Sequence, residues 1–307
     1  MENLEVMLVF DGRNVICSRS DTWQELWKYA SEKSIWNDAI GRNQVYLAAF
    51  NGLYALGKET GTLAWKKEGF EKIQKIITHN DTVLVADMAQ GMQALSAQDG
   101  GIIWNFKKNR INDLLESGGK IYAASSVGLF SLGAEKGNSW ELLNKSQWFS
   151  LEETRDAIYA ANENCILKIN KNSESIDTYT CLYSAIQRIT ADENVLYIST
   201  KKCIAALDGR NLALKWEKNI ENIDGAFKVQ ASSLYAAEWH GKLYAIDKDK
   251  GEIQWEHEYP HYITDVKEIL FRDEDTGRER GMLLIEDTFI ARQRKTHRYL
   301  RIPGHRL

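Results

Sequence analysis

The residues best suited to chemistry are few in this sequence and do not form a reactive set. The four cysteines, Cys17, Cys165, Cys181 and Cys203, are scattered, with no Cys-x-x-Cys pair and no zinc-type spacing. No histidine shares a predicted element with a cysteine or second histidine at metal-ligand spacing. Isolated thiols at apolar strand positions are typical of buried, unreactive cysteines, and secreted disulfides are the alternative. We therefore expect no metal site and no catalytic residues.

One acidic run, Asp247–Glu252, alternates carboxylates with a glycine, as calcium-binding loops do. Ca²⁺ takes roughly six to eight oxygen ligands, and this run coincides with a turn that recurs along the chain, so we interpret it as an ordinary turn. The sequence contains no phosphate-binding loop, no dinucleotide fingerprint and no signal of a strained nucleophile elbow. We expect no bound cofactor.

The composition is that of a globular protein. Of 307 residues, 44% are hydrophobic and 27% are charged, which excludes a disordered or collagen-like chain. The net charge of −4 provides no general basic field for nucleic acid. No apolar run approaches the ~18 residues of a membrane span, and Met1–Asp11 lacks the basic start of a secretory signal. We expect a cytoplasmic protein.

An internal repeat of about 38 residues runs through the sequence. Eight copies fit the chain, from Met7–Trp27 to a degenerate copy at Met282–Ile302. Each has short runs rich in Val, Ile, Leu and Tyr between Gly, Asn and Asp, which predicts four strands per copy. One copy has lost its marker tryptophan near Thr178. The marker residues are Trp27, Trp65, Trp104, Trp140, Trp216 and Trp255.

A four-stranded repeat of this length fits the blade of a β-propeller. We predict one all-β domain over residues 1–307, a single closed β-propeller with eight four-stranded blades. Seven blades are the alternative, because the first copy lacks an innermost strand that Ile263–Phe271 would supply. The marker tryptophans are expected to lie flat between neighbouring blades, where each indole buries about 150–250 Å².

Two segments resemble a known family. Ala55–Trp65, ALGKETGTLAW, has the A-x-x-x-x-T-G-x-x-x-W form of pyrroloquinoline-quinone-like repeats, and Ala245–Trp255, AIDKDKGEIQW, is similar. The resemblance covers nearly the whole chain and implies a β-propeller. It extends to quinone-cofactor dehydrogenases, but the chain lacks the vicinal cysteines and long inserts that those enzymes imply. The chain is more similar to the non-catalytic scaffold type, although it lacks that type's signal and lipidated cysteine.

A face for binding is expected where loops join the second strand to the third and one blade to the next. Trp239 lies there, outside the tryptophan register and in a one-residue insertion. Aromatic side chains without a core role are typical anchors of binding surfaces, and the alternative is that Trp239 and Trp148 plug the channel or pack locally. The predicted protein-binding residues are Phe50, Met88, Glu238, Trp239, His240, Tyr259 and Tyr262.

The C-terminal segment, Arg292–Leu307, has six basic residues and no acidic one. It admits a phosphate backbone as partner, but we expect its arginines to point outward and to pair with acids. We predict a cytosolic, non-catalytic propeller that binds one or more proteins, as a platform or a regulatory subunit of a larger complex, with no membrane contact. The alternatives are an enzyme with a site at the mouth of the channel and a nucleic-acid-associated protein that uses the basic end.

Overall fold

The computed structural model describes residues 6–19, 24–50, 52–107, 110–134, 140–180, 185–259, 262–272, 279–289 and 294–301. All regular structure in these ranges is β-strand, which confirms the predicted all-β class. The described residues include no helix that is long and apolar enough to span a bilayer.

The chain divides into two compact units, residues 1–151 and 152–307. The strands of unit 1, in chain order, are β1 (Val6–Gly12), β2 (Asn14–Arg19), β3 (Glu25–Ala30), β4 (Ile35–Ile40), β5 (Gln44–Ala49), β6 (Gly52–Gly57), β7 (Leu63–Glu68), β8 (Ile73–His79), β9 (Thr82–Asp87), β10 (Gly91–Ser96), β11 (Ile102–Phe106), β12 (Ile111–Ser117), β13 (Lys120–Ser125), β14 (Gly128–Gly133) and β15 (Trp140–Asn144). They form three four-stranded sheets, β4–β7, β8–β11 and β12–β15, and an antiparallel run β1–β3.

Unit 2 repeats this organisation. Its strands are β16 (Ser150–Glu153), which begins at the unit boundary, β17 (Ala157–Ala161), β18 (Cys165–Asn170), β19 (Ile176–Thr180), β20 (Ile186–Asp192), β21 (Val195–Thr200), β22 (Ile204–Asp208), β23 (Leu214–Lys218), β24 (Ile223–Gln230), β25 (Ser233–Glu238), β26 (Lys242–Asp247), β27 (Ile253–Glu258), β28 (Tyr262–Arg272), β29 (Glu279–Phe289) and β30 (Arg294–Arg301). The four-stranded sheets are β16–β19, β20–β23 and β24–β27, and β28–β30 is a further antiparallel run.

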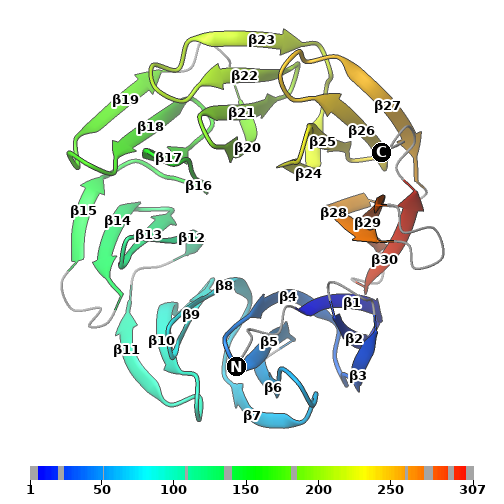
Figure 1. Ribbon diagram of the computed structural model, residues 1–307. Coiled ribbons are helices and arrows are strands. Elements are labelled where there is room, and N and C mark those ends of the chain that lie inside the picture. Colours follow the sequence, from blue (N-terminus) through cyan, green and yellow to red (C-terminus); the bar gives the residue numbers. More distant parts are fainter. Residues whose placement is uncertain are drawn as a thin grey trace. The chain divides into compact units, whose positions relative to one another are not determined.

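The strand pairing corrects the predicted number of blades. The described strands belong to seven sheets, and each four-stranded sheet is an antiparallel meander (Figure 1). This agrees with the alternative of seven blades and not with eight, because the first and last copies each supply only three strands, β1–β3 and β28–β30. The run Ile263–Phe271 is part of a strand, β28, as the seven-blade alternative requires. Closure of the propeller and its status as one domain stay predictions.

The hydrophobic core lies between consecutive sheets. In β9, Val83 and Val85 pack into the cluster shared with β4–β7, whereas Leu84 and Ala86 pack into the cluster shared with β12–β15. Successive side chains of a strand point to opposite faces, so each such sheet is buried on both faces. This explains why the two middle strands of a sheet, such as β9 and β10, are buried at nearly every position.

Three marker tryptophans, Trp27, Trp65 and Trp216, contact a turn of the next sheet, as predicted. Trp140 differs, because it is 47% exposed and packs on Phe106 of the preceding sheet. Trp65 is buried, and its indole Nε1 donates to the Ala97 carbonyl of the next sheet at 2.8 Å. Its ring lies on Gly100, whose φ is +71° and where an added Cβ would stand 2.8 Å from the indole. Trp216 makes the same contacts with Lys248, at 2.9 Å, and with Gly251. The conformation with positive φ and without a side chain is what lets the indole approach the turn.

Removal of one such indole is expected to destabilise the protein. Trp65→Ala should lower the free energy of unfolding by about 3–5 kcal/mol, the usual cost of deleting a buried aromatic side chain. Urea unfolding followed by circular dichroism measures this. Leu63→Ala, at a half-exposed position of the same strand, is the control and should change stability by less than about 0.5 kcal/mol. Equal effects of the two substitutions would contradict the structural role of Trp65.

Alanine substitutions at two glycines distinguish the effect of a steric clash with the indole from the effect of backbone strain. Gly100 and Gly118 both have positive φ, but an added Cβ meets Trp65 only at Gly100 and finds no atom within 4 Å at Gly118. Both alanine variants should show the strain of a left-handed alanine, about 1–2 kcal/mol. Gly100→Ala should cost about 1–3 kcal/mol more, because the packed ring must shift. Equal unfolding midpoints in urea would show that the ring does not rest on this turn.

Candidate functional site

The residues predicted to bind a protein are divided between the two units. Phe50 and Met88 lie in unit 1, after β5 and β9. The other five lie in unit 2, in the turn after β25 and in the segment before and at the start of β28. They are Glu238, Trp239, His240, Tyr259 and Tyr262. Each unit is therefore considered by itself.

Trp239 and Tyr262, which we name the aromatic pair, contact each other in unit 2. Their ring centroids are 4.9 Å apart and the ring planes are tilted by 48°. The indole of Trp239 is 47% exposed, in a turn closed by a hydrogen bond from the Gly241 amide to the Glu238 carbonyl. The half-buried Tyr262 donates its hydroxyl to the Asp224 carbonyl at 2.6 Å. The exposed indole therefore rests on a ring whose position is fixed.

One backbone carbonyl anchors the surroundings of the pair. The guanidinium of Arg188, in β20, donates to the Asp224 carbonyl from Nη2 at 2.7 Å and from Nε at 3.2 Å. Tyr262, in β28, donates to the same oxygen. Residues of three consecutive sheets thus meet at Asp224 in β24. Burial raises the pKa of the Tyr262 hydroxyl, so this group stays a donor at neutral pH.

Asp224 lies in a β-bulge of strand β24. In β24, Ile223 pairs with Glu238 and Phe227 with Ala236, so the bulge holds two extra residues. The first strand of the preceding sheet has one extra residue at the same place, between Ile186 and Arg188.

The Asp224 carboxyl group is held in an unfavourable environment. Its Oδ1 is buried and has no hydrogen-bond partner among the described residues. Burial raises the pKa of this carboxyl group, because a low-dielectric surrounding disfavours the charged form. The positive charge of Arg188 and the imidazole of His240 oppose the rise, and the carboxylate of Glu238 adds to it.

The three remaining residues of the unit 2 set differ in exposure. His240 is exposed, and Glu238 is partly buried and accepts a hydrogen bond from the Tyr244 hydroxyl. Burial, together with that bond, raises the pKa of Tyr244 to about 12. Tyr259 is only 9% exposed and packs in the core cluster that includes Leu243. Tyr259 is therefore a core residue, and the prediction that its ring is exposed for binding is wrong.

The unit 1 residues form a smaller apolar feature. Phe50 is exposed, and its ring meets the edge of Trp36, with centroids 6.4 Å apart. Met88 is partly buried and follows Asp87, a fully buried residue whose carboxylate accepts four backbone amides. Those amides belong to Glu71, Lys72, Ala89 and Gln90. The loop that carries Met88 is therefore firmly held.

Several residues singled out in the sequence have structural roles. Trp148 is fully buried, and its carbonyl accepts a hydrogen bond from Asn112, so the alternative of local packing holds for it. Cys17 and Cys203 are buried, as expected. Burial raises the pKa of the Cys17 thiol to about 11 and also raises that of Cys203. Cys165 is partly buried and free.

Two charged segments were also singled out in the sequence, the acidic run Asp247–Glu252 and the basic segment Arg292–Leu307. In the turn at Asp247, the side chain accepts the amides of Asp249 and Lys250, as in the ordinary turn that we predicted. The described residues include no group of three or more His, Cys, Asp or Glu side chains placed to hold a metal ion. Tyr183, His261 and much of Arg292–Leu307 lie outside the described residues.

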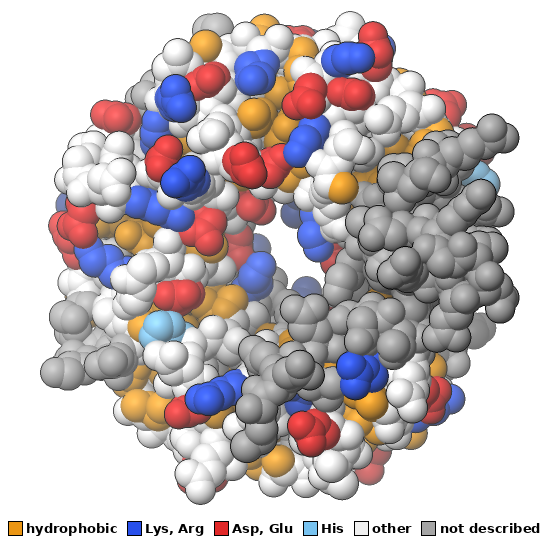
Figure 2. Space-filling view, in the orientation of Figure 1, with side chains coloured by type: hydrophobic (Ala, Val, Ile, Leu, Met, Phe, Trp, Pro, Cys, Tyr) orange, Lys and Arg blue, Asp and Glu red, His pale blue; other side chains and the backbone are white. Residues whose placement is uncertain are grey.

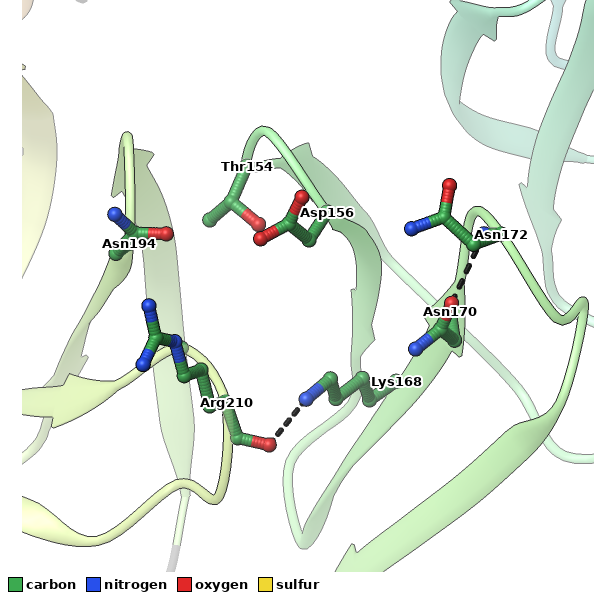
Figure 3. Close-up of a pocket in the computed structure, with 8 residues that line it drawn as sticks. Thr154, Asp156, Lys168, Asn170, Asn172, Asn194 and Arg210 are labelled. Atoms are coloured by element: carbon green, nitrogen blue, oxygen red, sulfur yellow. Dashed lines mark hydrogen bonds between the residues drawn. The ribbon is translucent and has the colours of Figure 1, made fainter.

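A polar cavity that the sequence did not predict lies at the other end of the unit 2 strands. It has a volume of about 360 Å³ and lies where hairpin turns of the sheets β16–β19 and β20–β23 meet (Figure 3). The sequence does contain a signal for this cavity, because Lys168 occupies the position at which the repeat motif has alanine. The lining residues are Thr154, Asp156, Lys168, Asn170, Asn172, Asn194, Gly209 and Arg210.

Comparison with known proteins places the chain in a family. The model of a family described as outer membrane protein assembly factor BamB matches residues 12–144 and 176–257. The chain belongs to this family. The resemblance to pyrroloquinoline-quinone-like repeats is thereby confirmed. No curated protein matches the chain.

Solved structures show the fold of this BamB-family chain. BamB from Moraxella catarrhalis is 13% identical, with a TM-score of 0.75 over 99% of this chain and 93% of that one. Sqt1 from Saccharomyces cerevisiae is 12% identical, with a TM-score of 0.76 over 98% and 94%. The quinohemoprotein alcohol dehydrogenase ADHIIG from Pseudomonas putida HK5 is 10% identical, with a TM-score of 0.67 over 92% and 68%. These likenesses establish a β-propeller fold.

The raised pKa of Asp224 predicts a pH-dependent stability effect. A carboxyl group whose pKa is raised by folding favours the protonated folded state, and this contribution is lost as the pH rises through its folded pKa. Asp224→Asn should therefore be more stable than the wild type at pH 7, with a smaller difference near pH 4. Urea unfolding at both pH values measures it.

Asp208→Asn is the control of opposite sign. A hydrogen bond from the Arg210 amide lowers the pKa of Asp208, so this substitution should reduce stability at neutral pH, with the difference shrinking in acid. If Asp224→Asn behaved like Asp208→Asn, the assignment of Asp224 as an uncompensated carboxyl group would be wrong.

Proposed function

We propose that this chain is a cytoplasmic, non-catalytic protein-binding platform whose partner docks on the aromatic pair, Trp239 and Tyr262. The observation that carries the proposal is the half-exposed indole of Trp239, which the repeat does not require and which lies on a hydrogen-bonded tyrosine. Tryptophan and tyrosine dominate the binding energy of many protein interfaces. Phe50 and Met88 stay predictions for unit 1.

The surroundings of the pair suit a protein partner. Arg188 and His240 are exposed beside it, and the Glu238 carboxylate lies in the same turn. Such groups supply a polar rim around an apolar anchor. On the face that Figure 2 shows, acidic and basic side chains of the described residues are interspersed. Because the turns are held by hydrogen bonds, little ordering entropy is lost on binding.

Membership of the BamB family supports the scaffold role over the enzyme alternative. The likeness to the alcohol dehydrogenase is one of fold, at 10% identity. The free thiols of Cys17, Cys165 and Cys203 support a reducing compartment such as the cytoplasm. Burial and high thiol pKa values also keep Cys17 and Cys203 unreactive.

Removal of either ring of the pair should weaken binding. Trp239→Ala and Tyr262→Ala are each expected to raise the Kd for the partner about 10-fold or more, as loss of a hot-spot aromatic does. The partner is identified by capture from the native host with quantitative mass spectrometry, comparing wild type and Trp239→Ala, and the Kd is then measured with purified proteins.

Leu214→Ala is the matched control, because Leu214 is an exposed apolar residue of the same unit on the outer strand β23. It should leave the Kd unchanged, and Trp239→Ala should leave the melting curve nearly unchanged. If binding survives both aromatic substitutions but is lost on deletion of residues 298–307, the basic end is the true site and the proposal fails.

A further inference from the structure

The sheet β16–β19 departs from the repeat at two facing positions. In four other sheets the motif's alanine pairs with the marker tryptophan, as Ala55 does with Trp65 and Ala206 with Trp216. Opposite Trp27 and Trp140 the paired residues are Cys17 and Leu132. In β16–β19, Lys168 occupies the alanine position and pairs with Asp177. The missing tryptophan is therefore replaced by Asp177, one residue before the position that sequence spacing suggests. The family match also skips residues 145–175, which hold most of this sheet.

The turn of the next sheet that would contact the missing indole, Asp208–Leu212, keeps the backbone conformation of the corresponding turns. By analogy with Ala97 and Lys248, the Gly209 carbonyl is the expected acceptor for the missing indole N–H. It accepts the hydroxyl of Tyr159, as the Lys248 carbonyl accepts that of Tyr197 beside Trp216. Leu212 stands where the other turns have glycine, and it keeps a positive φ of 56°. The site that a tryptophan fills elsewhere is thus framed by the same backbone but lacks the ring.

The cavity of about 360 Å³ lies at this turn and has a charged lining. Lys168 is 8% exposed, and its ammonium group donates to the Arg210 carbonyl. An ammonium group has three donors, and among the described residues Lys168 forms no ion pair, not even with the exposed Asp177 across from it. Lys168 and Arg210 against Asp156 give a net charge of +1. A poorly solvated ammonium without a counter-charge is unfavourable.

Figure 3 shows how these groups are arranged around the cavity. Arg210 and Asn194 come from one sheet, and Lys168, Asn170 and Asn172 come from the other, with Asp156 beside Thr154. In the described part of the chain, neither the Arg210 guanidinium nor the Asp156 carboxylate has an ion-pair partner. Positive donors and a hydrogen-bond acceptor therefore border the same space.

We propose that this vacated tryptophan site binds a small polar molecule that carries one oxyanion group. The carboxylate or phosphate contacts Lys168 and Arg210 through charge-assisted hydrogen bonds. Hydroxyl groups of the same ligand donate to Asp156 and contact the carboxamides of Asn172 and Asn194. The proposal is independent of protein docking at the aromatic pair, since the cavity lies at the opposite end of the strands.

A second polar groove offers a matched comparison. In unit 1, hairpin turns of the sheets β4–β7 and β8–β11 border a groove of about 570 Å³ that also contains an arginine and a lysine, Arg42 and Lys58. Between these sheets Trp65 is present and docked on Gly100. Arg42 is exposed like Arg210, so Arg42→Ala removes the same charge from a place where the tryptophan is retained.

The test is calorimetric titration of the full chain with phosphate, gluconate and glucose at constant ionic strength. Phosphate and gluconate represent the two oxyanions, and glucose is the uncharged control. We expect one of the anions to bind and glucose to bind far more weakly. Arg210→Ala and Lys168→Met should weaken binding of that anion about 10- to 100-fold, the range for a lost hydrogen bond to a charged group. Arg42→Ala should bind it like the wild type.

A double variant, Lys168→Ala with Asp177→Trp, rebuilds the motif of the other sheets. It should lose anion binding because the indole occupies the cavity. If it does not fold, Arg210→Ala at an exposed position still decides the question. The proposal is overturned if neither anion binds the wild type, if Arg210→Ala and Lys168→Met bind as tightly as the wild type, or if the folded double variant retains binding.

Discussion

The architecture depends on one recurring contact, in which an indole from the outer strand of one sheet lies on a glycine turn of the next. The ring reaches the peptide plane because the turn has positive φ and no Cβ, as at Gly61, Gly100 and Gly251. The indole N–H satisfies a carbonyl of the same turn, for example that of Lys58 for Trp27. Since the apolar core lies between sheets, this contact seals its outer edge and sets the spacing of consecutive sheets.

The features with functional promise are departures from this repeat. The strand β24 has a wider bulge than its neighbour, which brings Asp224 under the aromatic pair. The turn of Trp239 is one residue longer than that of the preceding sheet, and Lys168 replaces the alanine that four other sheets pair with an indole. Strand pairing resumes after the bulge of β24 and is uninterrupted at Lys168, because the backbone ladder does not depend on which side chain is present. A repeat of this kind therefore tolerates local change and keeps its core.

The two candidate sites of unit 2 follow different physical principles. The aromatic pair offers apolar area beside a polar rim, which suits a macromolecular partner. The vacated tryptophan site offers charge and hydrogen-bond donors in a confined volume, which suits a small anion. In both, a backbone carbonyl holds a cationic side chain: that of Asp224 holds Arg188, and that of Arg210 holds Lys168. A cation held by one carbonyl keeps further N–H donors that a ligand can use.

The sequence by itself determined the strand content, the repeat and the role of the marker tryptophans, because these follow from short-range periodicity and regular spacing. It also singled out Trp239 as an indole outside the register. Only the tertiary structure decided that Tyr259 is buried, that Arg188 and Asp224 join the aromatic pair, and that Lys168 faces a cavity. Those outcomes depend on contacts between residues tens of positions apart in neighbouring sheets. A bulge of one extra residue, or one missing ring, redirects such contacts without changing the repeat.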